Sequence, residues 1–274
     1  MRIESGIAQA RAAAAALKRP RGFVPTMGAL HAGHLALVSV ARRECASLAA
    51  SIYVNRLQFG DGEDFERYPR DFDADKARLE QAGVDLLFAP DERTMLPAHY
   101  STYIDVGSVA ADYEGGRRPG HFRGVATVVA KLLEIMRPDV LYLGQKDAQQ
   151  TAVVRRMVRD LGFSVDVRIV PTSREPDGLA LSSRNVYLSE EERRAAPSLH
   201  TALERTRELM ENGVDKGRAI AQASQMLEAP GTLEYLDVVD ADSFEPLETM
   251  RPPAFIIAAA RFGTTRLLDN LWIQ

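Results

Sequence analysis

The chain contains very little cysteine. Cys45 is the single cysteine among 274 residues. One thiol cannot form a disulfide within the chain, and it cannot build the zinc sites that need several cysteines. We therefore exclude small disulfide-stabilised scaffolds and expect a reducing compartment, the cytoplasm.

Long apolar runs are missing as well. The longest uncharged apolar stretches, such as 12–17 and 254–260, are far shorter than the roughly 20 residues with which a helix spans a bilayer. Glu4 and Arg11 interrupt the alanine-rich N-terminal segment, which is not the pattern of a secretory signal. We expect no transmembrane helix and no membrane partner.

The chain also lacks a surplus of positive charge. It has 34 Lys and Arg residues against 38 Asp and Glu residues, a formal net charge of -4. Such a chain has no general attraction for nucleic-acid phosphates, although a local basic pocket can still hold one small polyanion. We expect no nucleic acid partner. The hydrophobic content of 46% and the charged content of 26% are average for a globular protein, and the length suggests two domains.

The first 175 residues alternate short apolar runs with longer amphipathic stretches, the pattern of βαβ units. Strands are expected at 22–25, 49–54, 86–89, 140–143 and 165–169, with helices at 34–45, 71–82, 127–136 and 148–161. The pattern predicts an α/β fold with a Rossmann-like, doubly wound parallel sheet. Ligands of such sheets bind beyond the carboxyl ends of the strands.

The pattern changes after residue 188. Ser189 and Glu192 have the spacing of a capping box, which predicts a charged helix to about residue 212. A second helix at 216–227 and three strands at 233–239, 254–260 and 265–271 are expected to follow. We predict two domains, 1–175 and 176–274, the second a smaller α+β domain that serves as a lid and hinge.

The most informative motif lies where the first expected strand ends and a helix begins. The spacing of Gly28 and Gly33 suggests a P-loop, but His-Leu follows in place of the required Lys-Ser/Thr pair. His31 and His34 instead form a His-x-Gly-His motif, whose imidazoles lie on one face of a helix N-terminus. With the free amides there, they suit a triphosphate and the charge that builds at its α-phosphorus. The alternative is two polar residues that cap a buried helix; a metal site is weakly supported, and we expect none.

Two further stretches carry groups suited to phosphate. In 181–184, two serines precede Arg184, whose guanidinium can bind two phosphate oxygens at once. In 144–150, Lys146 offers a point charge, Asp147 can accept hydrogen bonds from ribose hydroxyls, and Gln150 lies one helical turn after Lys146. Taken alone, each stretch also fits an ordinary polar loop or helix start.

Two stretches point to a small polar substrate. Asn55 and Gln58 follow the second expected strand, and their amides can both donate and accept hydrogen bonds to a hydroxylated carboxylate. The Gly- and Pro-rich segment 116–122 contains Arg117 and Arg118, and it is equally consistent with a substrate loop and with a plain connection.

These five stretches, in this order, resemble the pantothenate synthetase (pantoate–β-alanine ligase) family of the HIGH-type nucleotidyltransferase superfamily. The likeness runs from residue 23 to the Arg-Phe-Gly-Thr-Thr-Arg-Leu-Leu-Asp-Asn stretch that ends at residue 270. It implies a cytoplasmic homodimer whose small-molecule partners are ATP, pantoate and β-alanine, with Mg2+ as cofactor. Pantoate would attack the α-phosphate of ATP to give pantoyl adenylate and pyrophosphate, and β-alanine would then displace AMP.

The resemblance also implies the site residues. His34 is the catalytic histidine, described as a proton donor in the family, with His31 and Lys146 beside it in the chemistry. Binding of pantoate and β-alanine is implied for Gln58, Gln150 and Asn55. The residues implied in ATP binding are Met27, Gly28, Ala29, Leu30, His31, Ala32, Gly33, His34, Gly144, Gln145, Lys146, Asp147, Ser173, Leu181, Ser182, Ser183 and Arg184.

Three positions depart from the family pattern. Arg56 stands where proline is usual, which exchanges a fixed φ for a long cation. Gln145 replaces the common Glu, and Ala148 a frequent aromatic residue. The alternatives are a nucleotidyltransferase that keeps the nucleotide on its product and a non-catalytic ATP-sensing protein. An aminoacyl-tRNA synthetase is disfavoured because the chain has little basic surface.

Overall fold

The computed structural model describes residues 1–60, 62–63 and 65–274. It forms two compact units, one made of residues 1–144 and 153–170 and the other of residues 145–152 and 171–274. The division of the chain at residue 175 that the sequence suggests stays a prediction. Within the described residues, no helix is both long and apolar enough to cross a membrane.

The first unit is built on a six-stranded sheet whose paired strands are all parallel. The strands lie in the order β1 (Arg2–Glu4), β4 (Leu86–Phe88), β3 (Ser47–Ile52), β2 (Arg21–Thr26), β5 (Val140–Gly144) and β6 (Asp166–Val170). From β2 the chain winds outward to β3 and β4 on one side, and from β5 to β6 on the other. The strand order therefore reverses between β2 and β5, which is where doubly wound sheets bind ligands.

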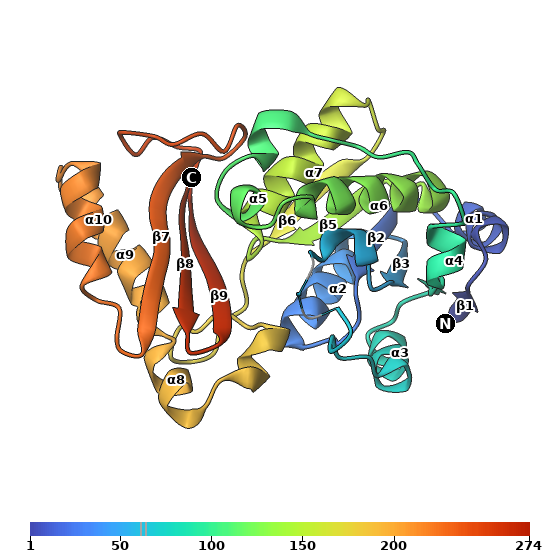
Figure 1. Cartoon of the computed structure of the whole chain (residues 1–274). Helices are drawn as coiled ribbons and strands as arrows, with labels where there is room; N and C mark the ends of the chain where they lie inside the picture. Colours follow the sequence, from blue (N-terminus) through green and yellow to red (C-terminus); the bar gives the residue numbers. More distant parts are fainter. Residues whose placement is uncertain (61, 64) are drawn as a thin grey trace. The chain divides into compact units, whose positions relative to one another are not determined.

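Helices cover both faces of this sheet (Figure 1). The helices that begin in this unit are α1 (Ile7–Ala15), α2 (Ala32–Glu44), α3 (Phe72–Gln81), α4 (Glu92–Met95), α5 (Glu114–Arg117) and α6 (His121–Met136), with the 3-10 turns η1 (Arg56–Gln58) and η2 (Gly107–Ala110). Val38 of α2 and Leu79 of α3 pack with Val24 and Leu48 of the sheet in one fully buried cluster. Burial of such side chains stabilises the unit by ~1.5–3 kcal/mol each.

The second unit carries a three-stranded antiparallel sheet in the order β7 (Gly231–Asp240), β8 (Ala254–Phe262) and β9 (Thr265–Ile273). Its helices are α8 (Glu190–Ala195), α9 (Ser198–Glu211) and α10 (Lys216–Ser224), with the 3-10 turn η3 (Ser183–Tyr187). The central strand β8 is buried along almost its whole length and packs against α9. Helix α7 (Ala148–Asp160) begins in this unit and ends in the first.

The predicted α/β fold with a smaller C-terminal α+β part is confirmed. Three local expectations differ from the structure. The predicted helix to residue 212 is split into α8 and α9 at Pro197, which has no backbone N–H for a continuous helix. Helix α5 ends at Arg117 and helix α6 begins at His121, so both ends of the predicted loop 116–122 are helical. Strand β1 was not expected, because it has three residues and two of them are charged.

Candidate active site

His31 and His34 cap helix α2 reciprocally. The Nδ1 atom of His31 accepts the backbone N–H of Gly33 at 3.1 Å, and the Nδ1 atom of His34 accepts the backbone N–H of His31 at 3.3 Å. Their ring centroids lie 4.1 Å apart. Because both Nδ1 atoms are acceptors, the proton of each neutral ring is on Nε2, which makes Nε2 a donor. Capping and anion binding are thus compatible: the Nδ1 atoms hold the helix and the Nε2 atoms provide donors.

The turn before this helix is fixed by α3. The buried carboxylate of Asp75 accepts the backbone N–H groups of Ala29 at 2.7 Å and Leu30 at 2.8 Å. Gly28 has φ +84, and a Cβ there would lie 2.9 Å from Asp75 Oδ2, so this position needs glycine. Arg78 donates to the Leu30 carbonyl at 2.7 Å. Asp75 and Arg78 were not among the predicted site residues, because no sequence motif links them to a turn more than 40 residues earlier.

Asn55 lies just before the turn η1, and Gln58 is its last residue. The buried Asn55 side chain donates to Gln58 Oε1 at 3.0 Å and to the Gly124 carbonyl at 3.1 Å, and it accepts the Leu57 N–H at 3.1 Å. Gln58 Nε2 contacts Met27 Sδ at 3.1 Å. The structure thus brings together Met27 and Gln58, with Asn55 as a support of the turn. The roles of Asn55 and Gln58 toward substrates stay predictions.

The backbone of Gln58 is held by α6 and the turn before it. His121 Nδ1 contacts the Gln58 carbonyl oxygen at 2.8 Å, and His121 Nε2 contacts Arg118 at 3.1 Å. Arg118 also forms two hydrogen bonds to Glu63, at 2.8 and 2.6 Å. Burial, assisted by the nearby Arg118 charge, lowers the pKa of His121 to about 4. His121 is therefore neutral at pH 7, with Nδ1–H donating to Gln58 and Nε2 accepting from Arg118.

Three residues whose roles the sequence left open have defined places. Arg118 supports Gln58, whereas Arg117 lies at the end of the short helix α5. Arg56, which replaces the usual proline, begins η1 and places its guanidinium 4.9 Å from the ring centroid of Phe65. A cation above an aromatic ring is attracted to it. The long cation is therefore accommodated outside the turn and does not disrupt it.

The segment 145–147 precedes α7 and belongs to the second unit. Lys146 Nζ lies 3.4 Å from Asp147 Oδ1, and its side chain is 21% exposed. Asn270 of β9 donates from Nδ2 to the carbonyl oxygens of Gln145 and Lys146. Gly144 ends β5, and Gln150 lies half-buried in α7.

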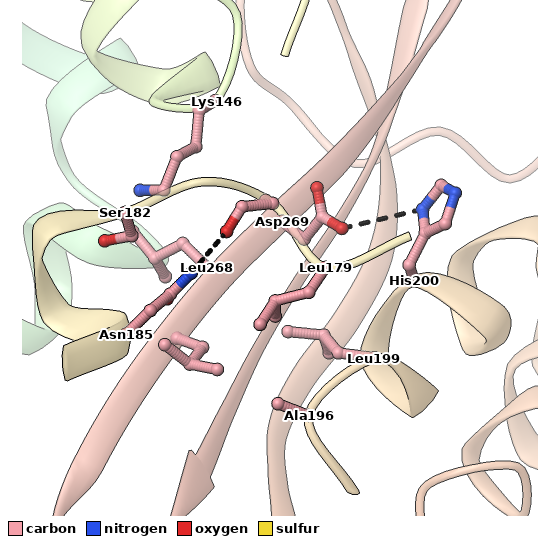
Figure 2. A pocket seen from close by; sticks show the side chains of 11 residues that line it. Lys146, Leu179, Ser182, Asn185, Ala196, Leu199, His200, Leu268 and Asp269 are labelled. Atoms are coloured by element: carbon pink, nitrogen blue, oxygen red, sulfur yellow. Dashed lines mark hydrogen bonds and ion pairs between the residues drawn. The ribbon is translucent and has the colours of Figure 1, made fainter. Parts of the chain in front are cut away.

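Ser173 and Leu181 are joined across a short hairpin, where the Leu181 N–H donates to the Ser173 carbonyl at 2.9 Å. Ser182 caps η3, which contains Ser183 and Arg184, by accepting the Arg184 N–H at 3.3 Å. Lys146 and Ser182 line the same pocket of the second unit, together with Asn185, His200 and Asp269 (Figure 2). Within this unit, the structure therefore brings two of the predicted ATP-binding stretches together.

Metal ligands do not gather in the described part of the chain. No group of three or more His, Cys, Asp or Glu side chains there could hold a metal ion.

Comparisons with known proteins agree over the whole chain. The family model of the pantoate-beta-alanine ligases matches residues 2–272. The chain is 51% identical over 277 residues to the pantothenate synthetase of Roseiflexus sp. (strain RS-1), with 100% of both chains covered. It is similar to a crystal structure of pantothenate synthetase from Thermus thermophilus, with a TM-score of 0.93, 52% identity and 99% of each chain covered.

A third relative was solved with ligands. The pantoate-beta-alanine ligase from Francisella tularensis, complexed with beta-gamma ATP and beta-alanine, is 33% identical, with a TM-score of 0.80. The similarity covers 99% of this chain and 97% of that one.

Proposed function

The chain belongs to the pantoate–β-alanine ligase family, and from this premise we propose how its own residues carry out the reaction. It is an ATP-dependent ligase that joins pantoate to β-alanine to give pantothenate. We propose that the reaction passes through pantoyl adenylate. The observation that carries the proposal is the pair His31 and His34, which present Nε2 donors at the N-terminus of α2, beside the point where the strand order reverses.

In the first step, a carboxylate oxygen of pantoate attacks the α-phosphorus of ATP. A P–O bond forms, the bond to the β-phosphate oxygen breaks, and pyrophosphate leaves with the electron pair. In the second step, the amine of β-alanine attacks the acyl carbon, AMP leaves, and the amine loses a proton. Pantoate is already ionised at pH 7, so the first step needs positioning and charge stabilisation rather than a base.

We propose that His34 and His31 donate to phosphate oxygens as charge develops on them. The α2 N-terminus adds backbone donors, and the Asp75 contacts keep the preceding turn 27–30 in one conformation. Gln58 and Gln150 are proposed to bind the hydroxyls and carboxylates of pantoate and β-alanine. Asn55 would contribute to this pocket chiefly by fixing the orientation of Gln58.

We propose that the segments 144–147 and 181–184 contribute further phosphate ligands. Lys146 would neutralise charge on the phosphates and on the pantoate carboxylate, and Arg184 would bind two phosphate oxygens at once. The other proposed ATP contacts are Gly144, Gln145, Asp147, Ser173, Leu181, Ser182 and Ser183. The lid role of residues 176–274 stays a prediction.

Mg2+ fits this donor set as an ion that arrives with ATP. Mg2+ prefers carboxylate oxygens and phosphates, and it usually keeps several waters, so it needs no cage of protein ligands. Asp147 offers a carboxylate that is half exposed beside Lys146. When bound, Mg2+ supplies neutralisation of phosphate charge, and Asp147 would hold it together with the phosphates.

The proposed mechanism is tested by isotope exchange between ATP and pyrophosphate without β-alanine. We expect exchange that requires pantoate, and production of AMP and pantothenate once β-alanine is added. A nucleotidyltransferase that keeps the nucleotide on its product would exchange with a nucleoside monophosphate acceptor in place of pantoate. That result, or pantothenate formation without any exchange, would contradict the adenylate route.

We also propose a cytoplasmic homodimer. The family resemblance supports both parts, and the single, buried Cys45 is compatible with a reducing compartment. Sedimentation equilibrium of the purified chain would test the dimer, and a monomer at micromolar concentration would contradict it.

A further inference from the structure

The buried side-chain amide of Asn270 forms hydrogen bonds to two residues through both its nitrogen and its oxygen. Its Nδ2 donates to the carbonyl oxygens of Gln145 and Lys146, each at 2.9 Å. Its Oδ1 accepts from Gln145 Nε2 at 3.1 Å. Asn270 is only 1% exposed. A primary amide is the side chain that offers two donors and one acceptor from one short stem, which is what this segment requires.

Strand β9, which contains Asn270, is held in place by an ion pair at the preceding residue, Asp269. Asp269 accepts two hydrogen bonds from Arg174, at 2.6 and 2.8 Å, and its Oδ2 lies 3.6 Å from His200 Nδ1. Figure 2 shows the Asp269 carboxylate pointing to the His200 ring. Burial alone would raise the pKa of Asp269, but the adjacent His200 ring and the two hydrogen bonds from Arg174 outweigh it and lower that pKa. Asp269 is therefore ionised at pH 7.

The anchor also fixes the main chain of Asn270. Arg174 donates to the Asn270 carbonyl at 3.2 Å, and the Asn270 N–H donates to Asp269 Oδ1 at 2.7 Å. Successive side chains of a strand leave on opposite faces. Asp269 therefore holds β9 from one face while Asn270 reaches the segment 145–146 from the other.

We propose that Asn270 is a positioning residue for adenylate formation, because its amide holds the backbone of Gln145 and Lys146 where the Lys146 ammonium meets its substrate. Asn270 acts through Lys146 and touches no substrate itself. The proposal rests on the proposed role of Lys146. It adds a residue that lies more than 120 positions away in the chain and that none of the proposed substrate contacts includes.

The test uses pantoate-dependent ATP–pyrophosphate exchange by the full-length protein. Asn270→Asp keeps the shape of the side chain but replaces the Nδ2 donor by an oxygen. The carbonyl oxygens of Gln145 and Lys146 then face a carboxylate. We expect the exchange rate to fall about tenfold or more, the usual order for leaving buried polar groups unpaired. The matched control is Asn212→Asp, which removes an amide donor to the Glu208 carbonyl at the end of α9. We expect the control to stay within about twofold of wild type.

A double-mutant cycle separates positioning from general destabilisation. If Asn270 acts through Lys146, Asn270→Asp should change the exchange rate by less than about twofold in a Lys146→Ala background, because coupled residues are not additive. An equal loss in both backgrounds would overturn the inference and leave the role of Lys146 intact. Wild-type exchange by Lys146→Ala alone would instead defeat the proposed function of that lysine.

A second variant and a second measurement cover the case in which Asn270→Asp does not fold. Asn270→Ala removes the same hydrogen bonds without adding charge, and it can replace the first variant in the cycle. In the folded variant, we expect faster amide hydrogen exchange in peptides spanning 144–150 and unchanged exchange in α9. Unchanged exchange in 144–150, or failure of both variants to fold, would assign Asn270 to the fold alone and overturn the proposal.

Discussion

His34 Nδ1 accepts the backbone N–H of His31 at 3.3 Å, while His31 Nδ1 accepts from the Gly33 N–H at 3.1 Å. Each ring therefore has one nitrogen engaged in the helix cap and one that carries the proton. This arrangement fixes the tautomer of both rings before any substrate binds, so that the Nε2 donors need no rearrangement during the reaction.

Removing one of these donors should affect rate far more than folding. We expect His34→Ala to lower pantoate-dependent exchange at least ~100-fold, since the loss of one charge-stabilising donor commonly costs ~2.7–4 kcal/mol. The lost capping bond should lower the free energy of unfolding by only ~0.5–2 kcal/mol. His99→Asn, at an exposed position with φ 66, is the control for loss of a histidine elsewhere. Near wild-type exchange by His34→Ala would refute the assigned role.

Loss of the Arg184 side chain should raise the KM for ATP more than the KM for β-alanine. We expect Arg184→Ala to raise the KM for ATP at least about tenfold, because charge-assisted bonds to phosphate are worth roughly twice a neutral hydrogen bond. The KM for β-alanine should change little. Steady-state kinetics with each substrate varied in turn would check this. Equal increases in both KM values would count against a phosphate contact.

The stability of the protein should fall in mild acid because of His121. Its pKa is about 4 in the folded state, against an ordinary value near 6.5 when the chain is unfolded. Between these values the unfolded chain binds the additional proton, so stability is full above pH ~6.5 and declines as pH falls toward 4. The difference corresponds to about 3 kcal/mol.

The comparison for this prediction is His121→Gln, which cannot titrate in that range. Urea unfolding of both proteins between pH 4.5 and 7 should give a steeper pH dependence for wild type. The carboxylates contribute equally to both curves and cancel in the difference. Parallel curves would show that His121 is not held neutral by burial.

Substitution of Gly124 by any larger residue should destabilise the protein. A Cβ on Gly124 would lie 2.2 Å from the Leu57 carbonyl oxygen, so Gly124→Ala must displace η1 and with it Gln58. We expect a loss of ~1–3 kcal/mol in the free energy of unfolding, the usual cost of overpacking, together with a raised KM for pantoate.

The matched control for this prediction is Gly217→Ala in α10. Its nearest neighbour would be Asp215 Oδ1 at an ordinary 3.5 Å. Alanine is favoured over glycine inside a helix, so this variant should be unchanged or more stable by up to ~1 kcal/mol. Thermal unfolding of both variants would check the contrast, and equal stability would show that α6 moves away from η1 at no cost.

Short sequence patterns correctly predicted helix starts that depend on interactions between residues close together in the chain. The capping box of Ser189 and Glu192 forms as expected. The His-x-Gly-His stretch does begin a helix at the end of a parallel strand. The break at Pro197 was missed because charged, helix-forming stretches lie on both sides of it, although proline has no N–H for the helix.

The sequence by itself determined the class of fold and the side chains available at the carboxyl ends of the strands, because periodicity, caps and short motifs act over a few residues. Only the tertiary structure revealed which residues hold these motifs in place. Asp75 supports Ala29, His121 supports Gln58, and Asn270 supports Lys146, each across dozens of residues or more. Such partners depend on the path of the whole chain, since a buried polar group is satisfied by whatever folding brings near it.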